Sequence, residues 1–190
     1  MVDLKICSRR EALASAVMGC LALRALPGQD PKTDLRAATV VFVRHAEKEL
    51  DDPRDPVLTE RGQVRARKLA DLLASAGVSE LFSTDFRRTQ QTLQPLAERL
   101  GLSVGGYQAG KSEEFARSLA RRQAGDLVVV AGHSNTLPAM VRALGGRLVD
   151  LGERTDLEDD EYDRVVLLSL AAAGDQPMVC LQTLDLRMTL

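Results

Sequence analysis

The chain has only two histidines, His45 and His133, and each lies just after an apolar run. Arg44 stands beside His45, and Arg87 and Arg88 follow a third such run. Guanidinium groups bind phosphoryl oxygens through paired hydrogen bonds. A neutral imidazole nitrogen can attack phosphorus and carry the phosphoryl group covalently, and a second imidazole, if protonated, stabilises the negative charge. These residue types therefore predict a site for phosphoryl transfer.

The position of these side chains depends on the strands that precede them. Three runs have the length and composition of buried strands: Thr39–Val43, Glu80–Ser83 and Leu127–Ala131. In an open α/β sheet, ligands bind outside the carboxyl ends of the strands. If the three strands are near neighbours, both histidines and one arginine meet at that edge. Ser134 or Asn135 would cap the next helix, whose free N–H groups attract an anion.

Helical patterns alternate with strand-like runs along the rest of the chain. Helices are expected over Glu60–Ala76, Arg87–Leu100, Glu113–Arg122 and Leu137–Leu144, and further strands over Arg164–Leu170 and Met178–Leu184. Pro95 should bend the second of these helices. The alternation predicts a layered α/β domain with a largely parallel sheet.

Four segments, in this order, resemble the histidine phosphatase superfamily, also called the phosphoglycerate mutase-like family. Residues 43–48 resemble its Arg-His-Gly motif and residues 58–62 its Leu-Thr-x-x-Gly turn. Residues 83–92 resemble the segment with its second arginine, and residues 132–136 the block with its second histidine. The resemblance spans about residues 39 to 140, and four ordered motifs are far more specific than any one of them.

The resemblance implies a three-layer α/β sandwich and assigns four site residues. His45 becomes the phosphorylated nucleophile, and Arg44 binds the phosphoryl group beside it. Arg88 rather than Arg87 matches the second arginine, because it directly precedes a threonine, and His133 completes the phosphate pocket. One departure is Ala46, which stands where the family usually has glycine.

The proton donor for the leaving group is left open by the sequence. Many members of the family use a carboxylate after the second arginine, or an aspartate directly after the second histidine. Ser134 occupies the second of these places. Glu113, Glu114 and Glu47 are the remaining candidates, and the first two also fit a helix start, where acidic residues are favourable.

The short segment between Arg88 and His133 favours hydrolysis. Mutases of this family carry a long insertion there that covers the site, whereas here little chain remains for a lid, so water should reach the phosphohistidine. We therefore expect a small, lid-less, metal-independent phosphatase that hydrolyses phosphomonoesters, with a phosphorylated small molecule or a phosphoprotein as its substrate. The alternatives are a phosphohistidine protein phosphatase, a phosphoglycerate mutase-type isomerase, and a non-catalytic phosphate-binding module.

Composition excludes several other classes. A net charge of −2 gives no basic excess for nucleic acid. The cysteines at 7, 20 and 180 lack zinc-binding spacing, and the site motifs lack the carboxylate cluster that magnesium requires, so neither metal nor cofactor is expected. The acidic stretch Glu153–Asp163 is interpreted as a solvated loop without function, and Tyr162 as a packing residue.

Residues 1–32 differ from the rest and are interpreted as an export signal or a disordered N-terminal segment, followed by a single catalytic domain over 33–190. The basic pair Arg9-Arg10 precedes the uncharged run Ala12–Leu23, which is too short to span a bilayer in the mature chain. The pair indicates the twin-arginine type. Val17–Cys20 resembles a lipoprotein cleavage site with Cys20 as the lipid anchor. We expect a periplasmic or membrane-anchored bacterial protein; the alternative is a cytoplasmic protein with an N-terminal helix.

Overall fold

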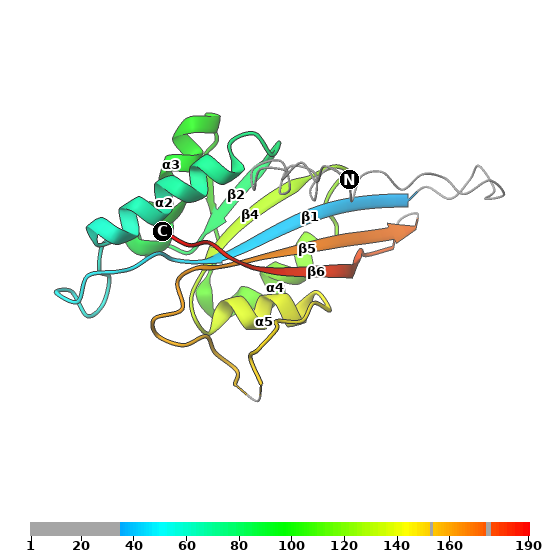
Figure 1. Ribbon diagram of the computed structural model, residues 1–190. Coiled ribbons are helices and arrows are strands. Elements are labelled where there is room, and N and C mark those ends of the chain that lie inside the picture. Colours follow the sequence, from blue (N-terminus) through cyan, green and yellow to red (C-terminus); the bar gives the residue numbers. More distant parts are fainter. Residues whose placement is uncertain (1–34, 153, 174–175) are drawn as a thin grey trace, which may run out of the picture. The chain divides into compact units, whose positions relative to one another are not determined.

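A six-stranded sheet, in the order β3-β2-β4-β1-β5-β6, forms the centre of the computed structural model, which describes residues 35–152, 154–173 and 176–190 (Figure 1). The strands are β1 (Leu35–Arg44), β2 (Glu80–Ser83), β3 (Val104–Gly106), β4 (Leu127–Gly132), β5 (Arg164–Ala173) and β6 (Val179–Arg187). β1 pairs in parallel with β4, β4 with β2, and β2 with β3. β5 is antiparallel to β1, and β6 is antiparallel to β5.

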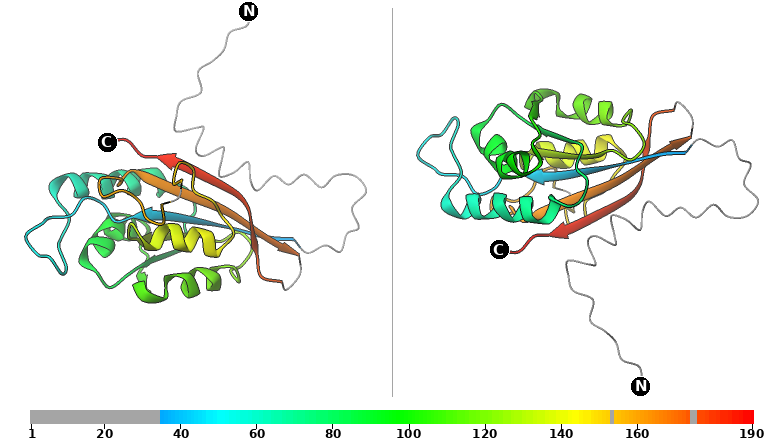
Figure 2. Two further views of the ribbon diagram at one scale, coloured as in Figure 1. Left: turned by 90° about the horizontal axis from the view of Figure 1, so that it is seen from below. Right: turned by 90° about the horizontal axis from the view of Figure 1, so that it is seen from above.

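Helices cover both faces of this sheet. They are α2 (Glu60–Leu73), α3 (Arg87–Leu100), α4 (Ser112–Leu119) and α5 (Thr136–Ala143), with a short 3-10 turn at Ala109–Lys111. α2 and α3 lie on one face, and α4 and α5 on the other, as Figure 1 and the two views of Figure 2 show. The prediction of an α/β sandwich with a mostly parallel central sheet is therefore confirmed.

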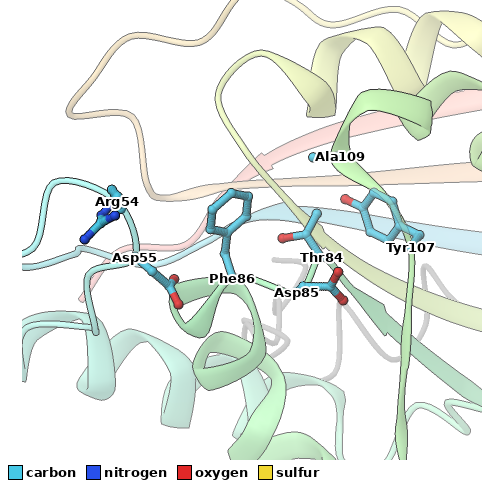
Figure 3. A pocket seen from close by; sticks show the side chains of 7 residues that line it. All are labelled: Arg54, Asp55, Thr84, Asp85, Phe86, Tyr107 and Ala109. Carbon is cyan, nitrogen blue, oxygen red and sulfur yellow. The ribbon is translucent and has the colours of Figure 1, made fainter.

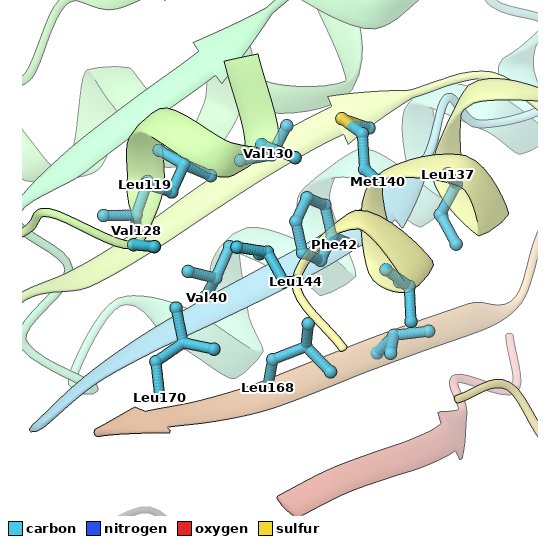
Figure 4. Close-up of a cluster of buried hydrophobic side chains, with 14 of the residues drawn as sticks. Val40, Phe42, Leu119, Val128, Val130, Leu137, Met140, Leu144, Leu168 and Leu170 are labelled. Atoms are coloured by element: carbon cyan, nitrogen blue, oxygen red, sulfur yellow. The ribbon is translucent and has the colours of Figure 1, made fainter. Parts of the chain in front are cut away.

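The side chains of β1 alternate between the two faces of the sheet and fill the core on both sides. Val40 and Phe42 belong to one buried cluster with Leu119 of α4 and Met140 of α5 (Figure 4). Val41, the residue between them, is also fully buried. Because successive strand side chains point to opposite faces, the apolar run Val40–Val43 within β1 requires helices on both sides. Burial of this kind contributes about 25 cal/mol per Å² of apolar surface removed from water.

Every expected helix and strand is present, although several begin or end up to four residues from the expected position. The α2 helix ends at Leu73, three residues before the expected end, and Gly77 adopts a φ of +79° in the turn that follows. α3 runs through Pro95 as one helix. β3 was not expected, because two of its three residues are glycines and it lies at the edge of the sheet.

The interpretation of residues 1–32 as an export signal concerns a part of the chain outside the described residues. Among the described residues, no helix is long and apolar enough to cross a membrane.

Candidate active site

The ends of β1 and β4 bring the two histidines together. Arg44 and Gly132 are the last residues of these strands and stand opposite each other in the parallel register. The main-chain N–H of His45 donates to the carbonyl of Gly132 at 2.9 Å, which extends the pairing by one residue. The ring centroids of His45 and His133 are 5.5 Å apart. Backbone pairing thus fixes the two motifs side by side at one edge of the sheet.

His45 is held as a neutral imidazole with a defined tautomer. Its Nδ1 lies 2.8 Å from the carbonyl oxygen of Ala46, which can only accept, so Nδ1 carries the proton and donates it there. The lone pair is then on Nε2, the nitrogen that can act as a nucleophile. Burial lowers the pKa of His45 to about 3, and the positive charges of Arg44 and Arg88 add to this effect. The His45 ring is therefore uncharged at neutral pH, with its one proton on Nδ1.

His133 faces Arg88 with one nitrogen and Thr84 with the other. Nε2 is 3.1 Å from the Thr84 hydroxyl, and Nδ1 is 3.4 Å from Nη2 of Arg88. The Thr136 hydroxyl accepts a hydrogen bond from the main-chain N–H of His133 at 2.8 Å. Burial lowers the pKa of His133 to about 4, and the neighbouring arginines lower it further. A bound phosphoryl group would offset both effects, since opposite charge favours the protonated imidazole.

Arg44 and Arg88 each present a buried nitrogen without a partner. Nη1 of Arg44 donates to the carbonyls of Glu158 and Glu161, and its Nε has no hydrogen-bond partner among the described residues. Arg88 lies over the ring of Phe86 at 4.3 Å, and its Nε also has no partner in that part of the chain. Unpaired buried donors are costly and therefore rare. Two of them on cations beside two histidines indicate an anion-binding site.

Arg87 lies outside this arrangement. Its side chain is exposed, whereas that of Arg88 is only 14% exposed. Of the two arginines considered from the sequence, it is Arg88 that stands beside His133.

The Leu-Thr-x-x-Gly turn holds the chain just after His45. Thr59 caps α2 by accepting from the N–H of Gly62, and its own N–H donates to the Glu47 carbonyl at 2.9 Å. A Cβ on Gly62 would lie 2.2 Å from that carbonyl oxygen, so only glycine permits this approach. The Ala46 N–H donates to the Thr92 hydroxyl. The two motifs recognised separately in the sequence are thus one packed unit.

The three carboxylates considered as proton donors have different surroundings. Glu47 is paired with Arg65, at 2.7 Å, and with Arg61, at 3.1 Å. Burial acts to raise the pKa of Glu47, but the hydrogen bonds from Arg65 outweigh it and lower the pKa. An ionised, paired carboxylate is a poor proton donor. Glu113 is exposed and paired with Arg117, and Glu114 is exposed in the first turn of α4.

A cavity of about 320 Å³ adjoins the pair of histidines through Thr84 (Figure 3). Its lining consists of Arg54, Asp55, Thr84, Asp85, Phe86, Tyr107 and Ala109. Asp55 accepts from the N–H of Arg87 and lies 3.9 Å from Nη1 of Arg88. Asp55 and Asp85 were not considered as proton donors from the sequence, although Asp85 lies within the segment that contains the second arginine. This cavity is the space next to the phosphate pocket where the remainder of a substrate can lie.

The acidic stretch before β5 was interpreted wrongly as a solvated loop without function. Its Glu158 and Glu161 carbonyls hold Arg44, and the Tyr162 ring centroid lies 4.3 Å from the guanidinium carbon of Arg44 and 5.9 Å from the His45 ring. Main-chain carbonyls leave no signal in a sequence. Tyr162, one of only two tyrosines, was the one hint that this loop approaches the site.

Within the described part of the chain, no group of three or more histidine, cysteine, aspartate or glutamate side chains is arranged to hold a metal ion.

Comparison with known proteins agrees with this geometry. Residues 40–109 match the model of the histidine phosphatase superfamily (branch 1), a segment that contains both arginines and the nucleophile candidate. This part of the chain therefore resembles the histidine phosphatase superfamily. A probable phosphoglycerate mutase GpmB from Enterobacter sp. (strain 638) is 31% identical over 71 residues, covering 34% of this chain and 33% of that protein. The match thus spans about a third of the relative's length.

Several solved structures share the fold of this chain at low sequence identity. A mycobacterial hydrolase 2 has a TM-score of 0.61 at 17% identity, covering 76% of this chain and 88% of its own. A mycobacterial glucosyl-3-phosphoglycerate phosphatase has a TM-score of 0.57 at 16% identity, covering 75% and 99%. A putative phosphohistidine phosphatase SixA from Agrobacterium tumefaciens has a TM-score of 0.54 at 22% identity, covering 77% and 97%.

Proposed function

We propose that this protein is a phosphatase that hydrolyses phosphomonoesters through a phosphohistidine on His45. One observation carries the proposal. The Ala46 carbonyl fixes the proton of His45 on Nδ1, which leaves Nε2 as a nucleophile in a pocket where two buried arginine nitrogens have no partner among the described residues. A phosphoryl group would accept from both guanidinium groups while facing the nucleophilic nitrogen.

The first step transfers the phosphoryl group to the enzyme. Nε2 of His45 attacks phosphorus, the bond to the leaving oxygen breaks, and that oxygen departs with the bonding electrons and takes up a proton. Arg44, Arg88 and His133 stabilise the charge on the three oxygens of the phosphoryl group in flight. In the second step, water attacks phosphorus, the N–P bond breaks, and inorganic phosphate leaves a neutral His45.

The shortness of the chain between Arg88 and His133 supports hydrolysis over isomerisation. Most of this segment forms α3, β3, α4 and β4, which belong to the sandwich itself. Little is left to cover the site and exclude water, as a mutase requires. A mutase would yield a phosphate isomer without net phosphate release, and a non-catalytic module would bind phosphate without turnover.

Trapping of the phosphoenzyme tests the proposal. Brief reaction with a ³²P-labelled phosphomonoester, followed by denaturation, should give a protein-bound phosphate that is labile in acid and stable in base. The label should vanish in His45→Ala and persist in Arg87→Gln, because Arg87 is exposed outside the pocket. A label that survives in His45→Ala would refute the assignment of the nucleophile.

A second candidate, a phosphohistidine protein phosphatase, is favoured by the state of Glu47. This carboxylate is paired with two arginines, so it is poorly suited to protonate an alkoxide. The imidazole that leaves phosphohistidine is far less basic than an alkoxide and needs less help from an acid. The open pocket would also admit a peptide.

Comparison of leaving groups separates the two candidates. The substrates are an alkyl phosphate, aryl phosphates of graded leaving-group pKa, and a phosphohistidine peptide, with His45→Ala as the blank. If kcat/KM rises steeply as the leaving-group pKa falls and is highest for the peptide, the second candidate is supported. A flat dependence with efficient alkyl phosphate hydrolysis would instead favour the first and imply a proton donor near the cavity.

We further propose that residues 1–32 direct export, with Cys20 as a lipid anchor if the lipoprotein pathway is used. Mass spectrometry of the mature protein tests this directly. A cleaved N-terminus would support export, and an intact Met1 in the purified cellular protein would contradict it.

A further inference from the structure

We propose that Glu161 is a positioning residue for the phosphate-binding Arg44. It acts through the segment Leu157–Tyr162, here called the arm, in the loop that joins α5 to β5 (yellow to orange in Figure 1). The inference deepens the proposed function and rests on it. The arm determines which edge of the Arg44 guanidinium is offered to the phosphoryl group.

The arm is attached at its start to the second histidine motif. The N–H of Leu157 donates to the carbonyl of Ser134, the residue directly after His133, at 3.0 Å. The Leu157 side chain is 4% exposed and belongs to the buried cluster beneath α5. The first residue of the arm is therefore fixed both by a hydrogen bond and by the core.

The middle and end of the arm hold Arg44 from two directions. Nη1 of Arg44 donates to the carbonyls of Glu158, at 2.5 Å, and Glu161, at 3.3 Å. The ring of Tyr162 lies against the guanidinium at 4.3 Å, a cation–π contact. Both carbonyls bind Nη1, so the arm makes no hydrogen bond to the edge of the guanidinium that contains Nε. A guanidinium fixed in this way does not have to be oriented during the reaction.

The Glu161 carboxylate gives the arm its shape. It accepts from the N–H of Glu158 at 3.2 Å, which closes the arm into a tight turn. It also accepts from Nε of Arg164 at 2.8 Å and pairs with Arg187 at 2.6 Å. Arg164 is 1% exposed and also pairs with Asp185 of β6, so the arm is tied to two strands of the sheet.

No hydrogen bond or ion pair among the described residues joins the Glu161 carboxylate to Arg44, although its negative charge acts to raise the pKa of Arg44. The contacts to Arg44 come from main-chain carbonyls, whereas the carboxylate is engaged by Arg164 and Arg187. Replacement of Glu161 should therefore loosen the direction of Arg44 more than it changes the charge at the pocket. Such a change should weaken interactions made only in the transition state more than those made in the ground state.

The experiment compares Glu161→Gln with Arg154→Gln. Arg154 pairs with the exposed carboxylate of Glu158 in the same loop and donates to the carbonyls of Leu151 and Asp150, so its replacement removes an ion pair without removing any contact made by Arg44. We expect Glu161→Gln to lower kcat about 10- to 100-fold, the usual effect of a residue that orients a ligand, with little change in KM. Vanadate, which mimics the trigonal transition state, should lose more affinity than inorganic phosphate. Arg154→Gln should match the wild type in all four measurements.

A pair of variants at Tyr162 keeps the test independent of folding, because this half-buried residue takes no part in the ion pairs around Arg164. Tyr162→Leu should show the same kcat loss and the same selective loss of vanadate. Tyr162→Phe, which keeps the ring against Arg44, should lose less kcat and less vanadate affinity than Tyr162→Leu.

The outcomes separate this inference from the proposed function. If the wild-type protein binds vanadate but hydrolyses none of the substrates, the proposed function is refuted. Selective loss of vanadate binding in Glu161→Gln and Tyr162→Leu would still support the role of the arm in positioning Arg44. Kinetic constants and vanadate affinity within about twofold of the wild type in both variants would overturn the inference. Equal losses for phosphate and vanadate would overturn it as well, because they indicate a general disruption of the pocket.

Discussion

Arg87 and Arg88 are neighbours in sequence with opposite surroundings. Arg87 is exposed, whereas Arg88 reaches His133 with one nitrogen and has a second, buried nitrogen without a partner in the described part of the chain. We expect Arg88→Gln to lower kcat/KM about 100- to 1,000-fold, the cost of removing one preorganised donor, whereas Arg87→Gln should stay within about twofold. Steady-state kinetics with an aryl phosphate measures both. Equal losses in the two variants would contradict the assignment of Arg88.

The two buried histidines make the stability of the fold depend on pH. Their pKa values in the folded protein, about 3 for His45 and about 4 for His133, lie below the ordinary value of 6.5. The unfolded chain therefore takes up these protons first, and acid favours unfolding. The free energy of unfolding should be highest above pH 6.5. It should fall below that pH, by up to about 1.4 kcal/mol per pH unit for each histidine.

Urea unfolding between pH 7 and pH 4.5 measures this dependence. His133→Asn removes one of the two groups, so its stability should fall less steeply over the same range. An unchanged slope in this variant would show that other groups, such as carboxylates, account for the acid sensitivity.

At the scale of elements, the contact between α2 and the first motif is close enough to test with a single methyl group. Gly62→Ala would place a carbon 2.2 Å from the Glu47 carbonyl oxygen, so the helix start or the motif must move. Overpacking of this kind costs about 1–3 kcal/mol, and the displaced motif should also lower activity. Gly110→Ala is the control, because a Cβ there meets nothing within 4 Å. Denaturant midpoints compare the two, and similar midpoints would contradict the close approach.

The elements that carry the site could be predicted because their signals are local. The apolar runs before His45 and His133 define β1 and β4, and the cap at Thr59 defines the start of α2. The edge strand β3 could not be predicted, since a segment with two glycines has no strand pattern and pairs only because β2 lies beside it.

At the scale of the whole molecule, the site residues that follow strand ends could be predicted from the sequence. Contacts that these residues make with main-chain groups far along the chain could not. Carboxyl ends of parallel strands meet at one edge, which places both histidines together. The partners of Arg44 lie more than a hundred residues away and bind through carbonyls, which every residue type possesses. The pairing that fixes the charge of Glu47 also depends on Arg65, a helix residue with no motif of its own.

The antiparallel course of β5 has a consequence for how this domain can diversify. Since β5 runs opposite to β1, with Val165 beside Val43, its first residues lie at the edge where the parallel strands end. The connection from α5 must therefore arrive beside the reacting histidines, whatever its sequence. Residues inserted upstream of Leu157 would build a new wall for the substrate while the sheet and the phosphate pocket stay unchanged. In this topology the connection from α5 to β5 can vary in length, and so change substrate selectivity, at little cost to the stability of the fold.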